Sequence, residues 1–433
     1  MDFISTRGAG PVGIEDAIMS GTATDGGLYV PSKLPNHKVE DFSLNDPIHV
    51  FASRFLSPFF HRSYLEPHLE AICEESFNFP LPLTDLNTEQ GQLSLLELFH
   101  GPTLAFKDIG ARFLAATMSR IISKNQISEP TTIIVATSGD TGAAVASAFH
   151  QRSGTRVVVL FPEGRVSERQ QHQLTCWGDN IISLAVKGEF DDCQRLAKEL
   201  FSDRQLVERY NLCSANSINV GRLLPQSVYY AYSSFMNFCS DACVSNYIVP
   251  TGNLGNGFAC AWAKQMGFPI GELVLSTNFN QTIPDYLDSG LWEPRKSIKT
   301  LASAMDVGDP SNMERLRFLW GEAEDLRSRI KSYSVNDSEI REQIMSEFNQ
   351  SGVIICPHTA TGVYTYRNNI PNKDKRDKHW VVVATAHASK FNEIIDPMIG
   401  ERPNTPDQLM RLLELPSEFE VIDPSINEIL DRF

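Results

Sequence analysis

Short apolar runs rich in β-branched residues recur along this 433-residue chain, and polar segments with helical character separate them. The clearest runs cover residues 132–136, 157–161, 181–186, 247–250, 273–275 and 380–384. Uninterrupted apolar strands are typical of sheets buried on both faces, and the helices between them supply the crossovers that parallel strands require. The pattern therefore predicts an α/β fold with parallel sheets covered on both sides.

The first part of the chain lacks this alternation. Residues 1–90 carry turn clusters at 8–11 and 25–27, followed by mixed helical segments that end in Phe79-Pro80-Leu81-Pro82. The alternating pattern begins directly afterwards. We therefore expect an N-terminal domain over residues 1–90 and a main region over residues 91–433.

The composition limits the partners. The formal net charge is −15, and no basic run offers the face that a nucleic acid needs. No apolar stretch approaches the ~18 residues of a membrane span, so neither partner is expected. The eight cysteines lack Cys-x-x-Cys spacing and are expected to be buried free thiols. Reduced cysteines and the lack of a basic targeting region at the start predict a cytosolic protein. The spacing of the histidines and carboxylates does not suggest a metal site.

One lysine is notable for its neighbours. Lys107 follows the Gly101-Pro102 turn and an apolar segment that ends in Phe106, and Gly110 and Ala111 lie three and four residues further on. Burial among apolar side chains lowers the pKa of a lysine, and a neutral amine is the form that attacks a carbonyl. The segment fits a Schiff-base lysine with ligand space beside Gly110 and Ala111. It also fits an ordinary first-turn lysine with its head in water.

A glycine-rich loop follows the run at 247–250. Gly252-Asn253-Leu254-Gly255-Asn256 can turn backbone N–H groups inward, and the helix expected at 258–266 presents its positive end to the same place. The loop matches neither a Walker motif nor the Gly-x-Gly-x-x-Gly fingerprint. It is a phosphate-site candidate, with a tight strand-to-helix turn as the alternative.

A second small-residue loop, Thr137-Ser138-Gly139-Asp140-Thr141-Gly142, follows the run at 132–136. Its hydroxyls and backbone donors suit a bound carboxylate. Asp140 does not suit an anion site, but a carboxylate is favoured at the start of the next helix. A substrate-carboxylate site and a capped helix start are both compatible with the loop.

Further candidates come from three other segments. Asn216-Ser217 and Arg222 begin a long aromatic-rich helix, and Arg165 lies in another turn. Either arginine could bind a phosphate, although each also fits a surface position or an ion pair. Thr385 ends the run at 380–384, where its hydroxyl could donate to a ring nitrogen or bond to the backbone.

Taken in order, these motifs resemble the threonine synthases, pyridoxal-phosphate enzymes of the tryptophan-synthase β-like fold. The resemblance rests on residues 5–8, 20–31, 98–108, 136–142, 216–219 and 384–387. It implies a fold-type II enzyme with two parallel-sheet α/β/α domains plus an N-terminal domain. A smaller mobile subdomain, over residues 115–215, would face a larger subdomain that holds the coenzyme.

The resemblance also implies a role for each candidate residue. Lys107 would bind pyridoxal 5'-phosphate covalently and then shuttle protons. Gly252, Asn253, Leu254, Gly255 and Asn256 would hold the coenzyme phosphate, and Thr385 would face the pyridine nitrogen. Thr137, Ser138, Asp140, Thr141, Arg165, Asn216, Ser217 and Arg222 would contact the substrate. The implied reaction converts O-phospho-L-homoserine and water to L-threonine and phosphate.

The chain departs from the family pattern at two places. Leu254 stands where many relatives carry phenylalanine, and Ala388-Ser389 stand where proline and alanine are common. Neither change removes a backbone donor or Thr385. No allosteric S-adenosylmethionine region is implied. Two rival functions stay open: a phospho-lyase of the same fold that releases 2-oxobutyrate, and a non-catalytic coenzyme-binding homologue. Oligomeric state, monomer or homodimer, stays open too.

Overall fold

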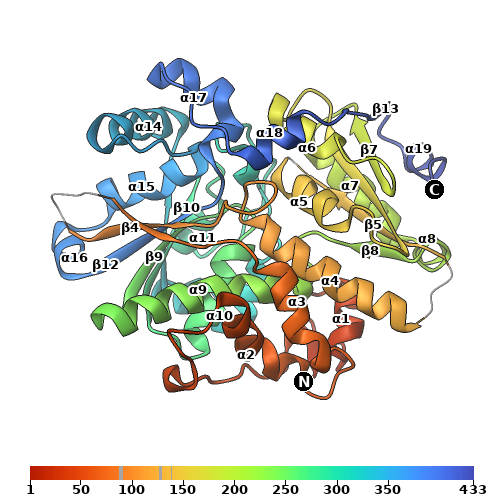
Figure 1. The fold of residues 1–433 in the computed structure, drawn as a ribbon, viewed down its shortest axis with the longest axis horizontal. Helices are drawn as coiled ribbons and strands as arrows, with labels where there is room; N and C mark the ends of the chain where they lie inside the picture. The colour runs from red at the N-terminus through yellow and green to blue at the C-terminus, as the bar shows by residue number, and fades with distance from the viewer. Residues whose placement is uncertain (87–90, 126–128, 138) are drawn as a thin grey trace.

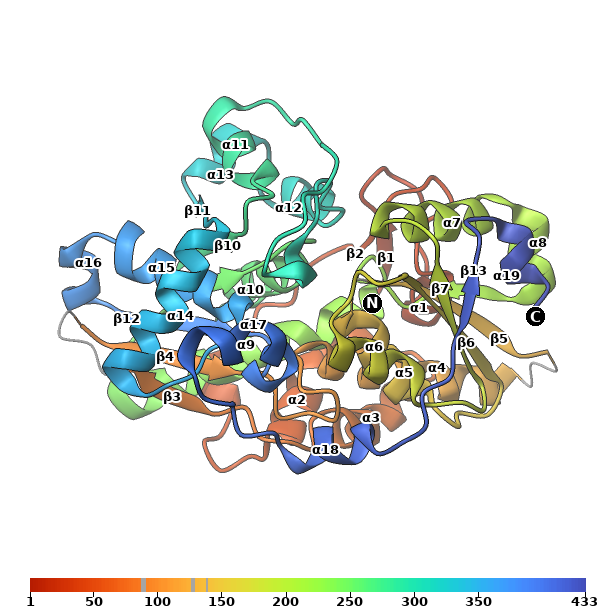
Figure 2. The same ribbon diagram turned by 90° about the horizontal axis from the view of Figure 1, so that it is seen from above.

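The computed structural model describes residues 1–86, 91–125, 129–137 and 139–433, and it confirms the α/β class with parallel sheets (Figure 1). A small antiparallel pair near the N-terminus joins β1 (Phe3–Ser5) to β2 (Tyr29–Pro31). Two larger sheets hold the remaining strands. Figure 2 shows the two larger sheets side by side, with helices around each.

The larger sheet has six strands in the order β11-β10-β9-β12-β4-β3. The strands are β11 (Ile330–Ser334), β10 (Ile270–Thr277), β9 (Ser245–Pro250), β12 (His379–Ala384), β4 (Leu93–Glu97) and β3 (Leu83–Leu86). All pairings are parallel except that of the edge strand β3 with β4. Because β4, β12 and β9 are adjacent and parallel, the loops after these strands meet at one edge of the sheet.

The second sheet has five parallel strands in the order β13-β7-β6-β5-β8. They are β13 (Glu420–Ile422), β7 (Ile181–Val186), β6 (Thr155–Pro162), β5 (Thr131–Ala136) and β8 (Leu212–Ser214). The sequence predicts β5, β6 and β7 but not β8 or β13, which have three residues each. Pairing of β13 with β7 places residues 420–422 in the same sheet as the strands of the predicted smaller subdomain, residues 115–215.

The helices cover both large sheets and form the N-terminal layer. The first nine are α1 (Ile14–Ser20), α2 (Ile48–Phe60), α3 (Leu69–Ser76), α4 (Lys107–Asn125), α5 (Asp140–Phe149), α6 (Glu168–Thr175), α7 (Phe190–Ser202), α8 (Arg204–Tyr210) and α9 (Val220–Asp241). The others are α10 (Gly255–Gln265), α11 (Thr282–Ser289), α12 (Met313–Trp320), α13 (Ala323–Arg327), α14 (Asp337–Ser351), α15 (Pro357–Asn369), α16 (Asn372–Asp377), α17 (Asn392–Ile399), α18 (Asp407–Leu413) and α19 (Ile426–Leu430). α9 packs against both α4 and α10 and so joins the two sheets.

The N-terminal residues share a core with the rest of the chain. Phe51 and Phe55 of α2 are fully buried and lie in one cluster with Phe235 of α9 and Phe268. Each buried phenylalanine contributes about 1.5–3 kcal/mol. The N-terminal residues therefore pack on α9 through a shared core, and β3, within the range 1–90, pairs with β4 of the six-stranded sheet.

The cysteines are all free thiols, and six of the eight are buried; Cys239 is exposed and Cys243 is half-buried. Across the described ranges, no helix combines the length and apolar character needed to cross a membrane.

Candidate active site

Lys107 begins α4 at the edge of the six-stranded sheet where β4 and β12 end. The loop before it pairs with the segment after β12: Phe106 N donates to Thr385 O at 2.9 Å, and His387 N donates to Leu104 O at 3.1 Å. Leu104 has a φ of 57°, which allows the turn into α4. These two backbone hydrogen bonds pair residues 104–106 with residues 385–387, so Lys107 directly follows the paired segment and lies beside Thr385.

The amine of Lys107 contacts α5, a helix that packs on the five-stranded sheet. Its Nζ donates to Thr141 Oγ1 at 2.7 Å and lies 5.2 Å from the ring centre of Phe106. Burial lowers the pKa of Lys107 to about 8; the Asp140 carboxylate opposes this change, and the Arg222 guanidinium adds to it. A useful fraction of the amine is therefore neutral near pH 7, as expected of a nucleophilic lysine.

The space that the sequence suggests beside Gly110 is filled. A Cβ at Gly110 would lie 2.7 Å from Arg222 O and 3.1 Å from Arg222 Nε. Ala111 is also completely buried. The small residue lets α4 approach α9 closely, so the prediction of ligand space beside Gly110 and Ala111 is wrong.

The loop from Thr251 to Asn256 is shaped by its own side chains. Asn256 Oδ1 accepts from Thr251 Oγ1 at 2.7 Å and from Gly257 N at 3.0 Å, while its Nδ2 donates to Pro250 O at 2.9 Å. Leu254 has a φ of 63° immediately before α10 begins. These contacts hold the turn and leave the start of α10 facing the sheet edge.

The amides of this loop suit an anion. In the part of the chain that the structure describes, the backbone N–H groups of residues 252–256 donate no hydrogen bond to protein. Gly252 lies so close to Met305 that a Cβ would be 2.7 Å from the Met305 Cα. Free amides at the first turn of a buried helix bind phosphate well. The residues therefore fit the phosphate of a cofactor.

Thr385 completes this half of the site. It is buried, its carbonyl is bonded to Phe106 N, and among the described residues its hydroxyl has no protein partner. A free hydroxyl near a nucleophilic lysine and a phosphate cradle matches the donor set that pyridoxal phosphate needs.

The loop after β5 divides its polar groups between two tasks. Thr137 Oγ1 accepts from Gly139 N at 3.0 Å and from Gly142 N at 2.9 Å, so its hydroxyl is occupied in shaping the loop. Thr141 instead contacts Lys107. Ser138, predicted to bind substrate, lies outside the described residues.

Asp140 has a compensating charge that the sequence analysis did not assign. Lys390 Nζ lies 2.7 Å from Asp140 Oδ1, and both side chains are buried. Burial by itself raises the pKa of Asp140, but the charges of Lys390 and nearby groups lower it to about 2. The only sequence signal for Lys390 is its position five residues after Thr385, and a contact between two sheets is needed to reveal its role.

The segment that begins α9 lies between the two loops. Asn216 Nδ2 donates to Ala136 O at 3.3 Å, and Ser217 Oγ accepts from Asn253 Nδ2 at 2.6 Å. The structure thus brings the predicted residues 216 and 217 between the ends of β5 and β9. Asn216 Oδ1 is buried without a partner among the described residues.

The two arginines differ sharply. Arg222 is 1% exposed; its Nη1 donates to Ala215 O at 2.5 Å, and its Nε has no partner in the described ranges. Burial lowers its pKa to about 10. Arg165 is exposed in the loop between β6 and α6, and among the described residues its side chain makes no hydrogen bond or ion pair. Only Arg222 lies against the helix of Lys107.

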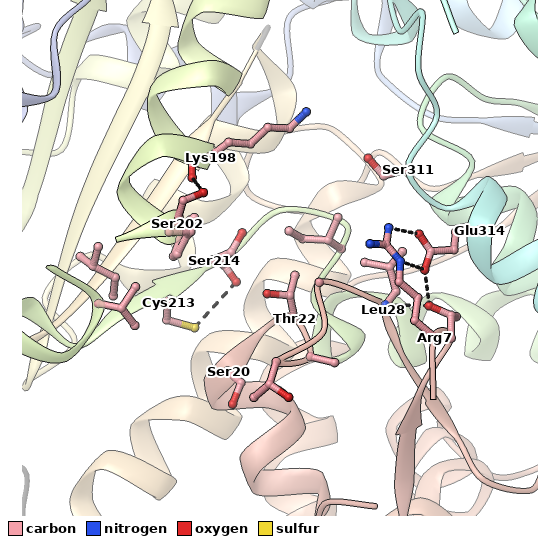
Figure 3. A pocket seen from close by; sticks show the side chains of 18 of the residues that line it. Arg7, Ser20, Thr22, Leu28, Lys198, Ser202, Cys213, Ser214, Ser311 and Glu314 are labelled. Atoms are coloured by element: carbon pink, nitrogen blue, oxygen red, sulfur yellow. Dashed lines mark hydrogen bonds and ion pairs between the residues drawn. The ribbon is translucent and has the colours of Figure 1, made fainter. Parts of the chain in front are cut away.

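A cleft lies beside the site, between α7 and α8 on one side and residues 306–311 on the other. Two hollows, of about 1760 Å³ and 1180 Å³, share the wall made by α7 and α8. The smaller reaches Asn216 and Asn253, and the larger extends to the N-terminal layer, where Arg7 forms an ion pair with Glu314 at 2.8 Å (Figure 3). Of the phosphate-loop candidate, Asn253 lines the smaller hollow, while Lys107 and Thr385 line neither hollow.

Comparison with known proteins identifies the family to which the chain is similar. Family profiles match residues 2–77 ("Threonine synthase N terminus"), 77–386 ("Pyridoxal-phosphate dependent enzyme") and 359–431 ("Threonine synthase, C-terminal"). The threonine synthase of Escherichia coli is 34% identical over 409 residues, covering 94% of this chain and 92% of its own. That of Saccharomyces cerevisiae is 29% identical and covers 99% of this chain and 96% of its own.

Solved structures agree. A threonine synthase from Brucella melitensis with bound pyridoxal phosphate has a TM-score of 0.90 and 32% identity, covering 100% of this chain and 98% of its own. The Escherichia coli structure also has a TM-score of 0.90, at 31% identity, covering 100% and 99%. The chain therefore belongs to the threonine synthase family of pyridoxal-phosphate-dependent enzymes.

Proposed function

We propose that this chain converts O-phospho-L-homoserine and water to L-threonine and phosphate, with pyridoxal phosphate attached to Lys107. The observation that carries the proposal is the amine of Lys107, which has a pKa near 8 and a hydrogen bond to Thr141 across the junction of the two sheets. When bound, the coenzyme supplies the electron sink for removal of protons next to the amino group.

The coenzyme would be held at three points. The free amides of residues 252–256 would bind its phosphate, and the positive end of α10 favours that charge. The Thr385 hydroxyl would donate to the pyridine nitrogen, which leaves that nitrogen uncharged. Lys107 would supply the covalent link. The backbone pairing of residues 104–106 with 385–387 supports this arrangement because it keeps two of the three points in register.

The substrate would lie over Lys107 between the loop after β5 and the start of α9. Thr141 would face the substrate carboxylate, Thr137 would hold the shape of the same loop, and Asp140 is already neutralised by Lys390. For the substrate phosphate, Arg222 has the stronger support, since its Nε is buried without a partner among the described residues. Asn216 and Ser217 would lie beside it, and Arg165 is the second candidate.

Proton transfer would rest mainly on Lys107. Its neutral amine would take the proton from the substrate Cα and return one later. His358 and His387 are poor candidates because burial lowers the pKa of each to about 4, so both are neutral and weakly basic at pH 7. Phosphate released from the substrate would then assist the addition of water at Cβ. We further expect a cytosolic enzyme.

Product analysis tests the proposal. The purified chain with pyridoxal phosphate and O-phospho-L-homoserine should release phosphate and form threonine in equal amounts. Lys107→Ala should abolish both, while Lys124→Ala, an exposed lysine at the end of the same helix, should change neither. 2-Oxobutyrate as the main product would make the chain a phospho-lyase instead. Absence of any turnover, with coenzyme bound, would support a non-catalytic homologue.

A further inference from the structure

Lys390 is a fully buried lysine whose charge is used inside the protein. Its Nζ lies 2.7 Å from Asp140 Oδ1 and donates to Thr103 O at 2.8 Å. Asp140 is 4% exposed and also accepts from Gln170 Nε2 at 3.1 Å. Taking two charges out of water has a large desolvation cost, and good geometry with additional hydrogen bonds is needed to offset it. Lys390 and Asp140 meet both conditions.

The pair joins segments that are far apart in the sequence. Asp140 begins α5 beside the five-stranded sheet, Lys390 follows β12 of the six-stranded sheet, and Thr103 lies in the loop that leads to Lys107. Thr103 in turn donates from N and Oγ1 to Asp108, at 2.9 Å and 2.7 Å. One ammonium group therefore connects the start of α5, the segment after β12 and the lysine loop.

The pair also acts on the amine of Lys107. Asp140 directly precedes Thr141, whose Oγ1 accepts from Lys107 Nζ. Apart from burial, which lowers the pKa of Lys107, the Asp140 carboxylate raises it, and the Arg222 guanidinium and the Lys390 ammonium lower it. The charges of Asp140 and Lys390 thus act on Lys107 with opposite signs, and as an ion pair they form a nearly neutral unit beside it.

We propose that Lys390 is a positioning residue of the coenzyme site. By pairing with Asp140 it neutralises a buried carboxylate beside Lys107, fixes the Thr141 hydroxyl against the lysine amine, and keeps that amine reactive near neutral pH. Lys390 acts through Asp140 and Thr103 and touches neither coenzyme nor substrate. The inference rests on the proposed function only in taking Lys107 as the coenzyme lysine.

Removal of one charge leaves the other buried without its partner. In Lys390→Met, the Asp140 carboxylate acts on Lys107 without the opposing charge of Lys390, while Arg222 acts as before, so the ammonium form of Lys107 is stabilised and its pKa rises. In Asp140→Asn, the unpaired ammonium of Lys390 repels a charge on Lys107 and lowers its pKa. The double variant removes both charges and returns the pKa toward the wild-type value. A purely structural role for the pair predicts no such opposite shifts.

The pKa of Lys107 can be measured without turnover. The full chain, freed of coenzyme, is labelled with isotopic acetic anhydride over a range of pH, and mass spectrometry of the Lys107 peptide gives its pKa. We expect shifts of about 1 unit, upward in Lys390→Met and downward in Asp140→Asn. Lys390→Arg keeps the charge and should restore most of the wild-type value. Lys187→Met, which breaks an exposed pair with Asp423, should leave Lys107 unchanged.

The outcomes separate the possibilities. Shifts in the same direction in both variants, or no shift in folded variants, would overturn the positioning role. If Lys390→Met does not fold, Asp140→Asn decides the case, because it preserves the shape of the side chain and must still lower the pKa. The labelling needs no substrate, so a chain that fails to make threonine would refute the proposed function while the effect of Lys390 on Lys107 is still measured.

Discussion

The most direct test of the phosphate cradle is Asn256, because its side chain holds the loop while the backbone is expected to bind the ligand. Asn256→Ala removes the acceptor for Thr251 Oγ1 and Gly257 N and the donor to Pro250 O. Each such hydrogen bond contributes about 1 kcal/mol. The three together predict a loss of about 3 kcal/mol in the free energy of unfolding.

The same change should weaken coenzyme binding. The free amides of residues 252–256 bind an anion only while the turn keeps them aligned. In the variant, coenzyme binding must also order the loop, so part of the lost stabilisation reduces the free energy of binding. If half of it is spent in this way, the dissociation constant of pyridoxal phosphate rises about tenfold, since 1.4 kcal/mol corresponds to a factor of ten. Urea unfolding of the coenzyme-free chain would measure the loss of stability. Titration of that chain with pyridoxal phosphate, followed by the visible absorption of the bound coenzyme, would measure the loss of affinity.

Asn256→Asp is the matched control. It keeps the oxygen acceptor for Thr251 and Gly257 but loses the donor to Pro250, and it adds a negative charge at the cradle. We expect a smaller loss of stability than in Asn256→Ala and a larger loss of coenzyme affinity. Unchanged affinity in both variants would show that the coenzyme phosphate binds elsewhere, and the assignment of the loop would be refuted.

Three further predictions concern the other contacts of the site. Gly110→Ala should lower the free energy of unfolding by about 1–2 kcal/mol in urea melts, because the clash with Arg222 O outweighs the better helix propensity of alanine. Thr141→Val removes the acceptor for Lys107 Nζ and should slow threonine formation at least tenfold at unchanged melting temperature. The pKa of Asp140 is about 2 in the fold against 3.8 in the unfolded chain, so its ionised form stabilises the fold by about 2 kcal/mol above pH 4. This stabilisation is lost as the pH falls toward 2. In acid titrations, Asp140→Asn should therefore show a flatter dependence of stability on pH in this range.

The sequence predicts well the features that depend on local pattern. β5, β6, β7, β9 and β12 occur where the apolar runs indicate, because a strand buried on both faces must be apolar throughout. The loops after β5 and β9 carry polar groups to the expected sheet edges. Short strands lack an apolar run and are not predicted. In β13, Glu420 and Val421 are exposed, and its pairing with β7 identifies it as a strand.

Features that depend on what a residue meets in space are not visible in the pattern. Gly110 suggests an empty space when only its neighbours in sequence are considered, and Arg222, more than a hundred residues later, fills it. Asp140 is unsuited to an anion site until Lys390 is placed against it. Arg165 and Arg222 look alike as candidates, yet one is exposed and the other is buried.

Among the residues that the structure describes, two ion pairs bridge the five-stranded and six-stranded parts of the molecule, and they differ in strength. Lys390 and Asp140 are buried, so their separation would leave two unsolvated charges. Lys296 and Glu189 meet at 2.7 Å near the hollow beside α7, and they are 71% and 48% exposed. Such an exposed pair contributes at most about 1 kcal/mol. We expect the mobility predicted for the smaller subdomain to separate Lys296 from Glu189 before it separates Lys390 from Asp140.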